Sequence, residues 1–187
     1  MDRSPAALYL EDIPEQFQKH KTLAEKALAQ VRDEDLFAAL DAESNSLAVL
    51  IQHVAGNLLS RWTDFLTTDG EKPARDRDSE FEVREEVTRE GLMARWEEGW
   101  ERLFQALAGL REEDLTRTVL IRAEPHSVIK AIHRQLTHHA YHTGQIVFLA
   151  KHLASEHWKN LSVPRGRTRD FNAQMFGRGS AGPVSGK

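Results

Sequence analysis

The sequence predicts an all-α protein, and more narrowly a four-helix bundle. Four long segments carry apolar residues at the spacings of three, four and seven that mark one face of a helix, little of the chain alternates like a strand, and one long polar segment separates the second helix from the third. A length of 187 residues fits one domain. We expect that domain to cover residues 1–176 and a disordered tail rich in glycine and serine to cover residues 177–187.

The first helix is expected over residues 12–32. Asp12 and Glu15 have the spacing of a capping box, which would place Pro14 in the first turn, where proline is tolerated. The alternative is a helix that begins near Ala6 and kinks at the proline. The predicted inward face consists of Ile13, Phe17, Ala24, Ala27 and Val31.

The second helix is expected over residues 46–66, after a run of residues that can cap it, Ser44 to Ser46. Its apolar stripe consists of Leu47, Leu50, Ile51, Val54, Leu58, Trp62 and Phe65. Residues 67–86 are polar and contain Gly70 and Pro73, so they predict a long crossover rather than a tight hairpin.

The third helix is expected over residues 87–110 and the fourth over residues 127–154, with a short β-like segment, residues 118–127, between them. Trp62, Trp96 and Trp100 have core spacing. The stripe of the fourth helix consists of Val128, Ile132, Leu136, His139, Ile146, Ala150 and Leu153. Beyond Ser155 we expect an irregular C-terminal arm.

Composition excludes several classes of protein. The absence of cysteine excludes disulfides, thiolate metal ligands and a cysteine nucleophile. The sequence contains no run of 18 apolar residues, so no membrane span is expected. The first residues lack the apolar core of a signal peptide, and a cytoplasmic protein is therefore expected. The net charge of -4 gives no reason to expect nucleic acid as a partner.

A pair of histidines in the segment HHAYHTGQ, residues 138–145, indicates a metal site. His138 and His142 are four residues apart, so on a helix they lie about 40° apart around the axis and about 6 Å apart along it. A pair with this spacing is also common among hydrogen-bonded core residues, and His139 falls at the centre of the apolar stripe. The zinc protease motif H-E-x-x-H and the E-x-x-H of di-iron bundles are both missing here.

A third ligand has to come from another helix, and His53 is the best candidate. It lies at the margin of its apolar stripe, so a half-buried polar residue at a helix interface is an equally good interpretation. Three histidines from two helices would leave open metal positions, as catalysis requires. Asn57 and Gln145 lie near these histidines and could orient an imidazole, although ordinary hydrogen bonding between helices is favoured for both. Gly144 could allow a close helix approach.

Four segments resemble the DinB/YfiT-like superfamily of metal-binding four-helix bundles, in its branch of uncharacterised bacterial proteins. The resemblance extends from about residue 8 to residue 176. Its most specific parts are the first histidine followed by asparagine and tryptophan, and the H-x3-H-x-G-Q block. The segments are SNSLAVLIQHVAGNLLSRWTDFLTTDGEKP (44–73), WEEGWERLF (96–104), LTHHAYHTGQIVFLAKHL (136–153) and LSVPRGRTRDFN (161–172).

The resemblance implies an up-down-down-up bundle with a divalent metal ion, usually nickel or zinc, held by His53, His138 and His142. It also implies a homodimer and a small-molecule substrate. Better-understood relatives transfer a low-molecular-weight thiol, and without cysteine in this chain such a thiol would have to be an external co-substrate. The alternatives are a metal-dependent hydrolase that uses bound hydroxide and a non-enzymatic, stress-related metal-binding protein. The resemblance assigns no catalytic residue, and the three histidines are expected as metal ligands.

Overall fold

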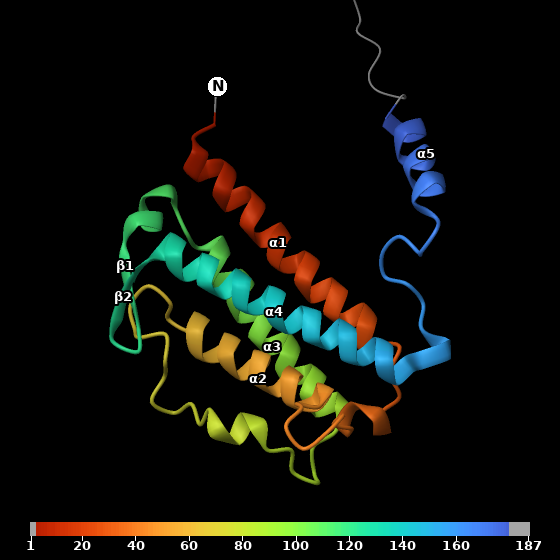
Figure 1. The fold of residues 1–187 in the computed structure, drawn as a ribbon. Coiled ribbons are helices and arrows are strands. Elements are labelled where there is room, and N and C mark those ends of the chain that lie inside the picture. Colours follow the sequence, from red (N-terminus) through yellow and green to blue (C-terminus); the bar gives the residue numbers. More distant parts are fainter. Residues whose placement is uncertain (1–2, 180–187) are drawn as a thin grey trace, which may run out of the picture.

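The computed structural model describes residues 3–179, and most of this part of the chain is helical (Figure 1). In Figure 1, two of the long helices run in one direction and the other two run in the opposite direction. The first pair, α1 and α4, pack along each other, as do α2 and α3. The expectation of a mainly α-helical protein is confirmed. The four helices are α1 (Pro5–Leu28), α2 (Leu47–Trp62), α3 (Arg89–Ala108) and α4 (Val128–Ala154).

Each of the four long helices begins after a serine or threonine that caps it. The hydroxyl oxygens of Ser4, Ser46, Thr88 and Ser127 accept hydrogen bonds of 3.0 to 3.3 Å from the backbone N–H three residues later. Because Ser4 caps α1 and a proline occupies its first position, α1 begins seven residues before the predicted start at residue 12. The predicted capping box is therefore wrong, and Pro14 lies inside the helix.

The core is centred on α2, in which every residue except Gln52 and Leu59 is buried. The three tryptophans predicted for the core are at most 2% exposed. A helix this deeply buried has almost no face toward solvent, so its polar side chains have to find partners within the protein. His53 and Asn57 have such partners in the crossover and in α4.

The crossover from α2 to α3 runs along the outside of α2 and contains a short 3-10 helix, η2 (Asp78–Phe81) (Figure 1). The crossover begins at a turn in which Asp64 has a φ of 49°, a value outside the helical region. Because of this turn, α2 ends at Trp62, four residues before the predicted end at residue 66. The first part of the crossover is joined to the hairpin of β1 (Thr118–Ile121) and β2 (Glu124–Ser127). The Asp69 carboxylate accepts the backbone N–H groups of Arg122 and Ala123 at 2.8 and 2.7 Å. The predicted crossover and the predicted β-like segment therefore pack together.

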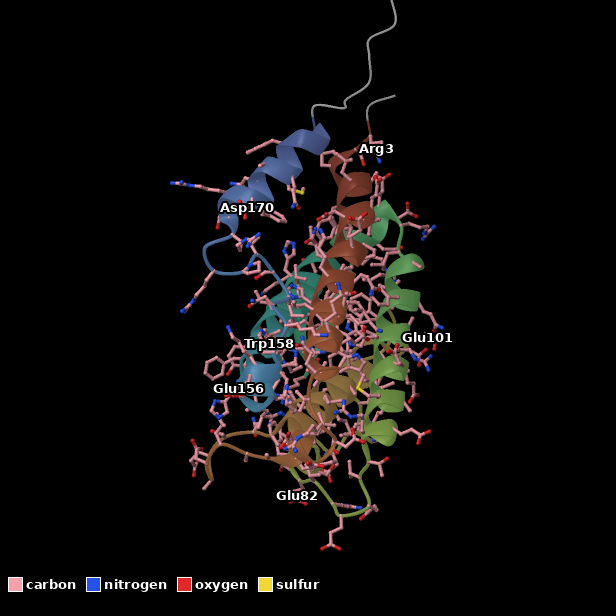
Figure 2. All side chains as sticks on the ribbon, turned by 90° about the vertical axis from the view of Figure 1, so that its right-hand side faces the viewer. Arg3, Glu82, Glu101, Glu156, Trp158 and Asp170 are labelled. Carbon is pink, nitrogen blue, oxygen red and sulfur yellow. The ribbon has the colours of Figure 1, made fainter. Side chains whose placement is uncertain are left out.

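The predicted irregular arm is wrong over its last part, where residues form α5 (Thr168–Gly179). Arg167 pairs with Asp170 in the first turn at 2.8 Å, and an acidic residue there is favourable for the helix dipole. Residues 177–179 of the predicted tail belong to this helix, and residues 180–187 lie outside the described residues. In Figure 2, Arg3 and Asp170 both lie toward one end of the molecule, and Glu82 of the crossover lies at the other end; Figure 1 shows that α5 and the start of α1 are well separated across that end.

Within residues 3–179, none of the helices combines the length and the apolarity that crossing a lipid bilayer requires.

Candidate metal site

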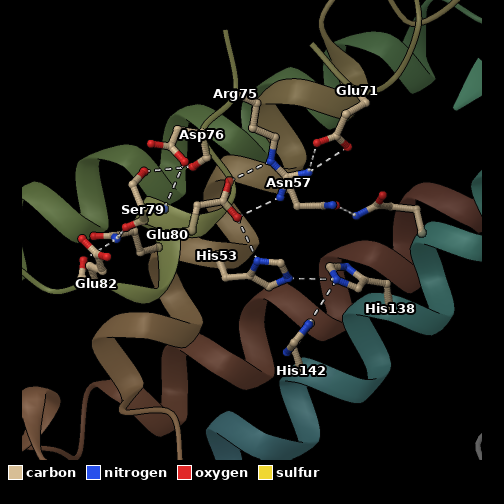
Figure 3. A network of polar contacts seen from close by, with 12 residues as sticks. His53, Asn57, Glu71, Arg75, Asp76, Ser79, Glu80, Glu82, His138 and His142 are labelled. Atoms are coloured by element: carbon tan, nitrogen blue, oxygen red, sulfur yellow. Dashed lines mark hydrogen bonds and ion pairs between the residues drawn. The ribbon is translucent and has the colours of Figure 1, made fainter. Parts of the chain in front are cut away.

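The structure brings together the three histidines proposed from the sequence (Figure 3). His53 comes from α2, and His138 and His142 come from adjacent turns of α4. The Nε2 atom of His138 lies 3.3 Å from Nε2 of His53 and 3.1 Å from Nε2 of His142. His53 and His142 are buried and His138 is half-buried.

Two of the rings are oriented through their other nitrogen. Nδ1 of His53 donates to Oε2 of Glu80 at 2.9 Å, and Nδ1 of His142 donates to Oε1 of Gln145 at 2.8 Å. These partners accept hydrogen bonds, so they assign the proton to Nδ1 and leave the Nε2 lone pair of both rings free. Carboxylate or amide partners of this kind orient metal-binding imidazoles in many proteins.

The distances from Nε2 of His138 to the other two Nε2 atoms fit a single ion, and the ligand atoms of all three histidines lie within 4.8 Å of one another. Metal–nitrogen bonds of about 2.0–2.1 Å at tetrahedral or octahedral angles separate two donor nitrogens by about 2.9–3.4 Å. The observed separations of 3.1 and 3.3 Å lie within this range. The donor set is also chemically suitable, because imidazole nitrogen binds zinc, nickel, copper and iron.

The surroundings keep the imidazoles of His138 and His142 neutral, which is the form that binds metals. Burial, together with the neighbouring His142 and His53, lowers the pKa of His138 to about 3. Burial likewise lowers the pKa of His142 to about 4, although the hydrogen bond to Gln145 opposes the shift.

A buried carboxylate on the crossover supports His53. Burial alone would raise the pKa of Glu80, but hydrogen bonds from His53 and Arg75 outweigh it, and the pKa lies below its usual value. Arg75 donates from Nε to Oε1 at 2.7 Å and from Nη2 to Oε2 at 2.8 Å. Gly56, one turn after His53, provides the space for Glu80, because a Cβ atom at residue 56 would overlap the carboxylate.

For the other residues singled out from the sequence, some of the expected roles agree with the structure and others do not. Gln145 orients His142, which is the alternative that was not favoured. Asn57 accepts a hydrogen bond from Gln135 of α4, which is the interaction between helices that was favoured. His139 is a core residue, with its ring centroid 4.6 Å from that of Trp100. Gly144 does not allow a close approach, because no heavy atom lies within 4 Å of a Cβ placed there.

Sequence reasoning missed Glu80 and Arg75. Both lie in the polar crossover, where many acidic and basic residues occur and no sequence pattern distinguishes these two from the others. No spacing rule links Glu80 to a histidine 27 residues earlier.

A small cavity of about 220 Å³ lies beside His53 and His138. Its other walls come from α2, the crossover, the hairpin turn and α4, and five of its nine residues are arginines. The lining residues are His53, Asn57, Arg61, Arg75, Arg77, Arg122, Arg134, Gln135 and His138.

Comparison with protein families matches residues 4–167 to the family described as "Protein of unknown function (DUF1572)". Comparison with curated proteins found no match.

Proposed function

We propose, from the premise that this chain belongs to the DUF1572 family, that it binds one divalent metal ion through His53, His138 and His142. The observation that carries the proposal is the convergence of three Nε2 atoms from two helices. We further propose that the helices form the up-down-down-up bundle of DinB-like proteins. The directions of the helices in Figure 1 and the resemblance of the sequence support this assignment.

The proposed activity is transfer of a low-molecular-weight thiol to a small electrophile. A divalent ion held by three neutral imidazoles supplies a Lewis acid that lowers the pKa of a thiol or a water molecule. The residues of the chain hold and orient the site: Glu80 fixes the ring of His53, Gln145 fixes the ring of His142, and the crossover shields one side. Nickel and zinc are the first ions to test, because both suit imidazole ligands.

The hydrolase alternative would need a general base beside the histidines. Glu80 is the carboxylate that contacts the cluster, and hydrogen bonds from His53 and Arg75 occupy both of its oxygens. This arrangement favours an orienting role over proton transfer, and so it favours thiol transfer over hydrolysis.

Metal content is the decisive measurement. Protein purified without a histidine tag should contain about one equivalent of metal by elemental mass spectrometry, and the double variant His138→Ala/His142→Ala should contain none. His152→Ala is the matched control, because His152 is an exposed histidine of the same helix. Absence of metal in the parent protein, with no binding of added nickel or zinc, would contradict the proposal.

Thiol transfer is tested separately on metal-loaded protein with a small thiol and an aryl chloride. In this reaction a C–S bond forms, the C–Cl bond breaks, and chloride and a proton are released. Thiol consumption should exceed that of free metal and of the His138→Ala/His142→Ala variant. Metal binding without this excess would contradict thiol transfer and leave the two alternatives, a hydrolase, which would show turnover without added thiol, and a non-enzymatic metal-binding protein.

The resemblance also leads us to propose a homodimer in the cytoplasm. Tyr141 and Phe148, seven residues apart on α4, are 63% and 70% exposed, and they give one helix an apolar stripe that a second copy could cover. Sedimentation velocity of the parent and of Phe148→Ser tests this. A monomeric parent would contradict it.

A further inference from the structure

The arginines of the cavity beside His53 and His138 converge from four separate parts of the fold. Arg61 belongs to α2, Arg75 and Arg77 to the crossover, Arg122 to the turn between β1 and β2, and Arg134 to α4. No carboxylate lines this cavity. Five positive side chains around one small space repel one another, so an arrangement of this kind is expected only where something negative offsets them.

Carboxylates behind the cavity wall balance some of these arginines. Glu80 and Glu71 both pair with Arg75. Arg122 reaches the same Glu71 at 3.4 Å, and Arg134 lies 3.9 Å from Glu124. Three carboxylates thus face five guanidinium groups, which leaves an excess of positive charge at the cavity.

Of the arginines in this cavity, Arg61 and Arg77 form no ion pair among the described residues, and Arg61 is the one that is buried. This residue is only 7% exposed, and its Nε has no hydrogen-bond partner. Across residues 3–179 its guanidinium forms no ion pair within 4.0 Å of a carboxylate. A buried N–H of a guanidinium without an acceptor is unfavourable, whereas a bound anion would supply that acceptor.

The backbone is shaped to admit this arginine. Gly70 passes so close to Arg61 that a Cβ atom at residue 70 would lie 2.8 Å from its Cδ and 3.2 Å from its Nε. The N–H of Gly70 donates to the carbonyl of Leu120 at 2.8 Å, which fixes the loop against the hairpin that carries Arg122. Arg61 and Arg122 are therefore held in place by the same contact between crossover and hairpin.

We propose that this cavity binds an oxyanion, a carboxylate or a phosphate, carried by the small molecule that reacts at the histidine site. The assignment of that molecule as a substrate rests on the proposed function, whereas the binding of the anion does not. The planar fork of arginine matches both kinds of oxyanion. The volume of about 220 Å³ is below that of typical drug-sized ligand pockets, so it suits an anionic group rather than a whole large ligand.

Calorimetric titration of metal-free protein with succinate and with inorganic phosphate, at fixed ionic strength, tests this proposal. We expect saturable binding of at least one probe and no binding of the neutral dimethyl ester of succinate. Saturation by succinate alone identifies a carboxylate site, and saturation by phosphate alone identifies a phosphate site. Failure of both probes to bind would overturn the inference.

Variants locate the binding. Arg61→Gln should weaken it at least about tenfold, because a charge-assisted hydrogen bond is lost. Arg134→Gln, at a half-exposed position, should weaken anion binding less than Arg61→Gln does. This variant keeps the test valid if the buried substitution Arg61→Gln prevents folding. Arg102→Gln, an exposed arginine of α3, is the matched control and should leave binding unchanged.

The variant His138→Ala separates this inference from the proposed function. Retention of anion binding in His138→Ala, with loss in Arg61→Gln, supports the arginine site even if no metal binds to the protein. Loss in His138→Ala with retention in both arginine variants would place the anion on the histidines and overturn the inference.

Discussion

Replacing Gly56 by alanine should weaken metal binding without touching a ligand. The new Cβ atom would overlap the Glu80 carboxylate and lie 2.8 Å from its Cδ, so the carboxylate has to leave its position beside His53. Loss of a partner that orients a metal-binding histidine lowers affinity about 10- to 100-fold. We therefore expect zinc affinity, measured by competition with a chromophoric chelator, to fall by that factor.

Stability gives a second, independent number for the same variant. If Glu80 loses both His53 and Arg75, the broken buried pair costs about 3–5 kcal/mol. Alanine in place of glycine inside a helix stabilises by about 0.5–1 kcal/mol, which leaves a net loss of about 2–4.5 kcal/mol in urea unfolding of the metal-free protein.

Gly144→Ala is the matched control. This glycine also lies within a helix, two residues from a proposed ligand, but no heavy atom lies within 4 Å of a Cβ placed there. Gly144→Ala should therefore stabilise by up to about 1 kcal/mol and leave zinc affinity unchanged. If Gly56→Ala behaves in the same way as Gly144→Ala, with zinc affinity within about threefold of the parent, the orienting role of Glu80 is refuted.

Three further predictions concern other parts of the site. In the folded protein the pKa values of His138 and His142 lie at about 3 and 4, below the value of about 6.5 in the unfolded chain. As the pH falls, the unfolded chain therefore binds protons before the folded protein does, which favours unfolding. Metal-free protein should lose stability from about pH 6.5 downward, and a flat urea-unfolding profile between pH 6.5 and 4.5 would contradict this. His139→Ala should lower the free energy of unfolding by about 2–4 kcal/mol, because it leaves a cavity in the core. The variant should bind as much metal as the parent protein, and loss of metal from a folded variant would make His139 part of the site. Gln145→Ala should lower zinc affinity at least about tenfold while Gln145→Glu retains it, and equal affinity in the two variants would exclude an orienting role.

The sequence predicts the parts of this protein that follow a regular period. The helical stripes place the four long helices, and the four-residue spacing places His138 beside His142 on α4. His53 was the weakest of the three from periodicity alone, because α2 is buried on nearly every side and the margin of its stripe is still interior. The helical pattern offered His53 as the best third candidate but left a half-buried polar residue as an equal interpretation, and the resemblance to other sequences favoured the ligand.

The rest depends on contacts between distant segments. Arg61 and Arg134 are 73 positions apart, and no local pattern reveals that both line one cavity. The helix α5 was missed for a different reason. It has no strong apolar stripe, and its first turn is stabilised by the pair of Arg167 with Asp170 rather than by burial.

The crossover is best understood as part of the site rather than as a connection. Buried ion pairs contribute little net stability, because desolvation offsets most of the attraction between the charges. The pair of Glu80 with Arg75 is therefore poorly explained as a device for stability. Its position explains it better: one oxygen of Glu80 fixes the ring of His53, and Arg75 lines the adjoining cavity. The helices supply the imidazoles, and the crossover supplies the carboxylate that orients His53 and part of the positive charge beside it.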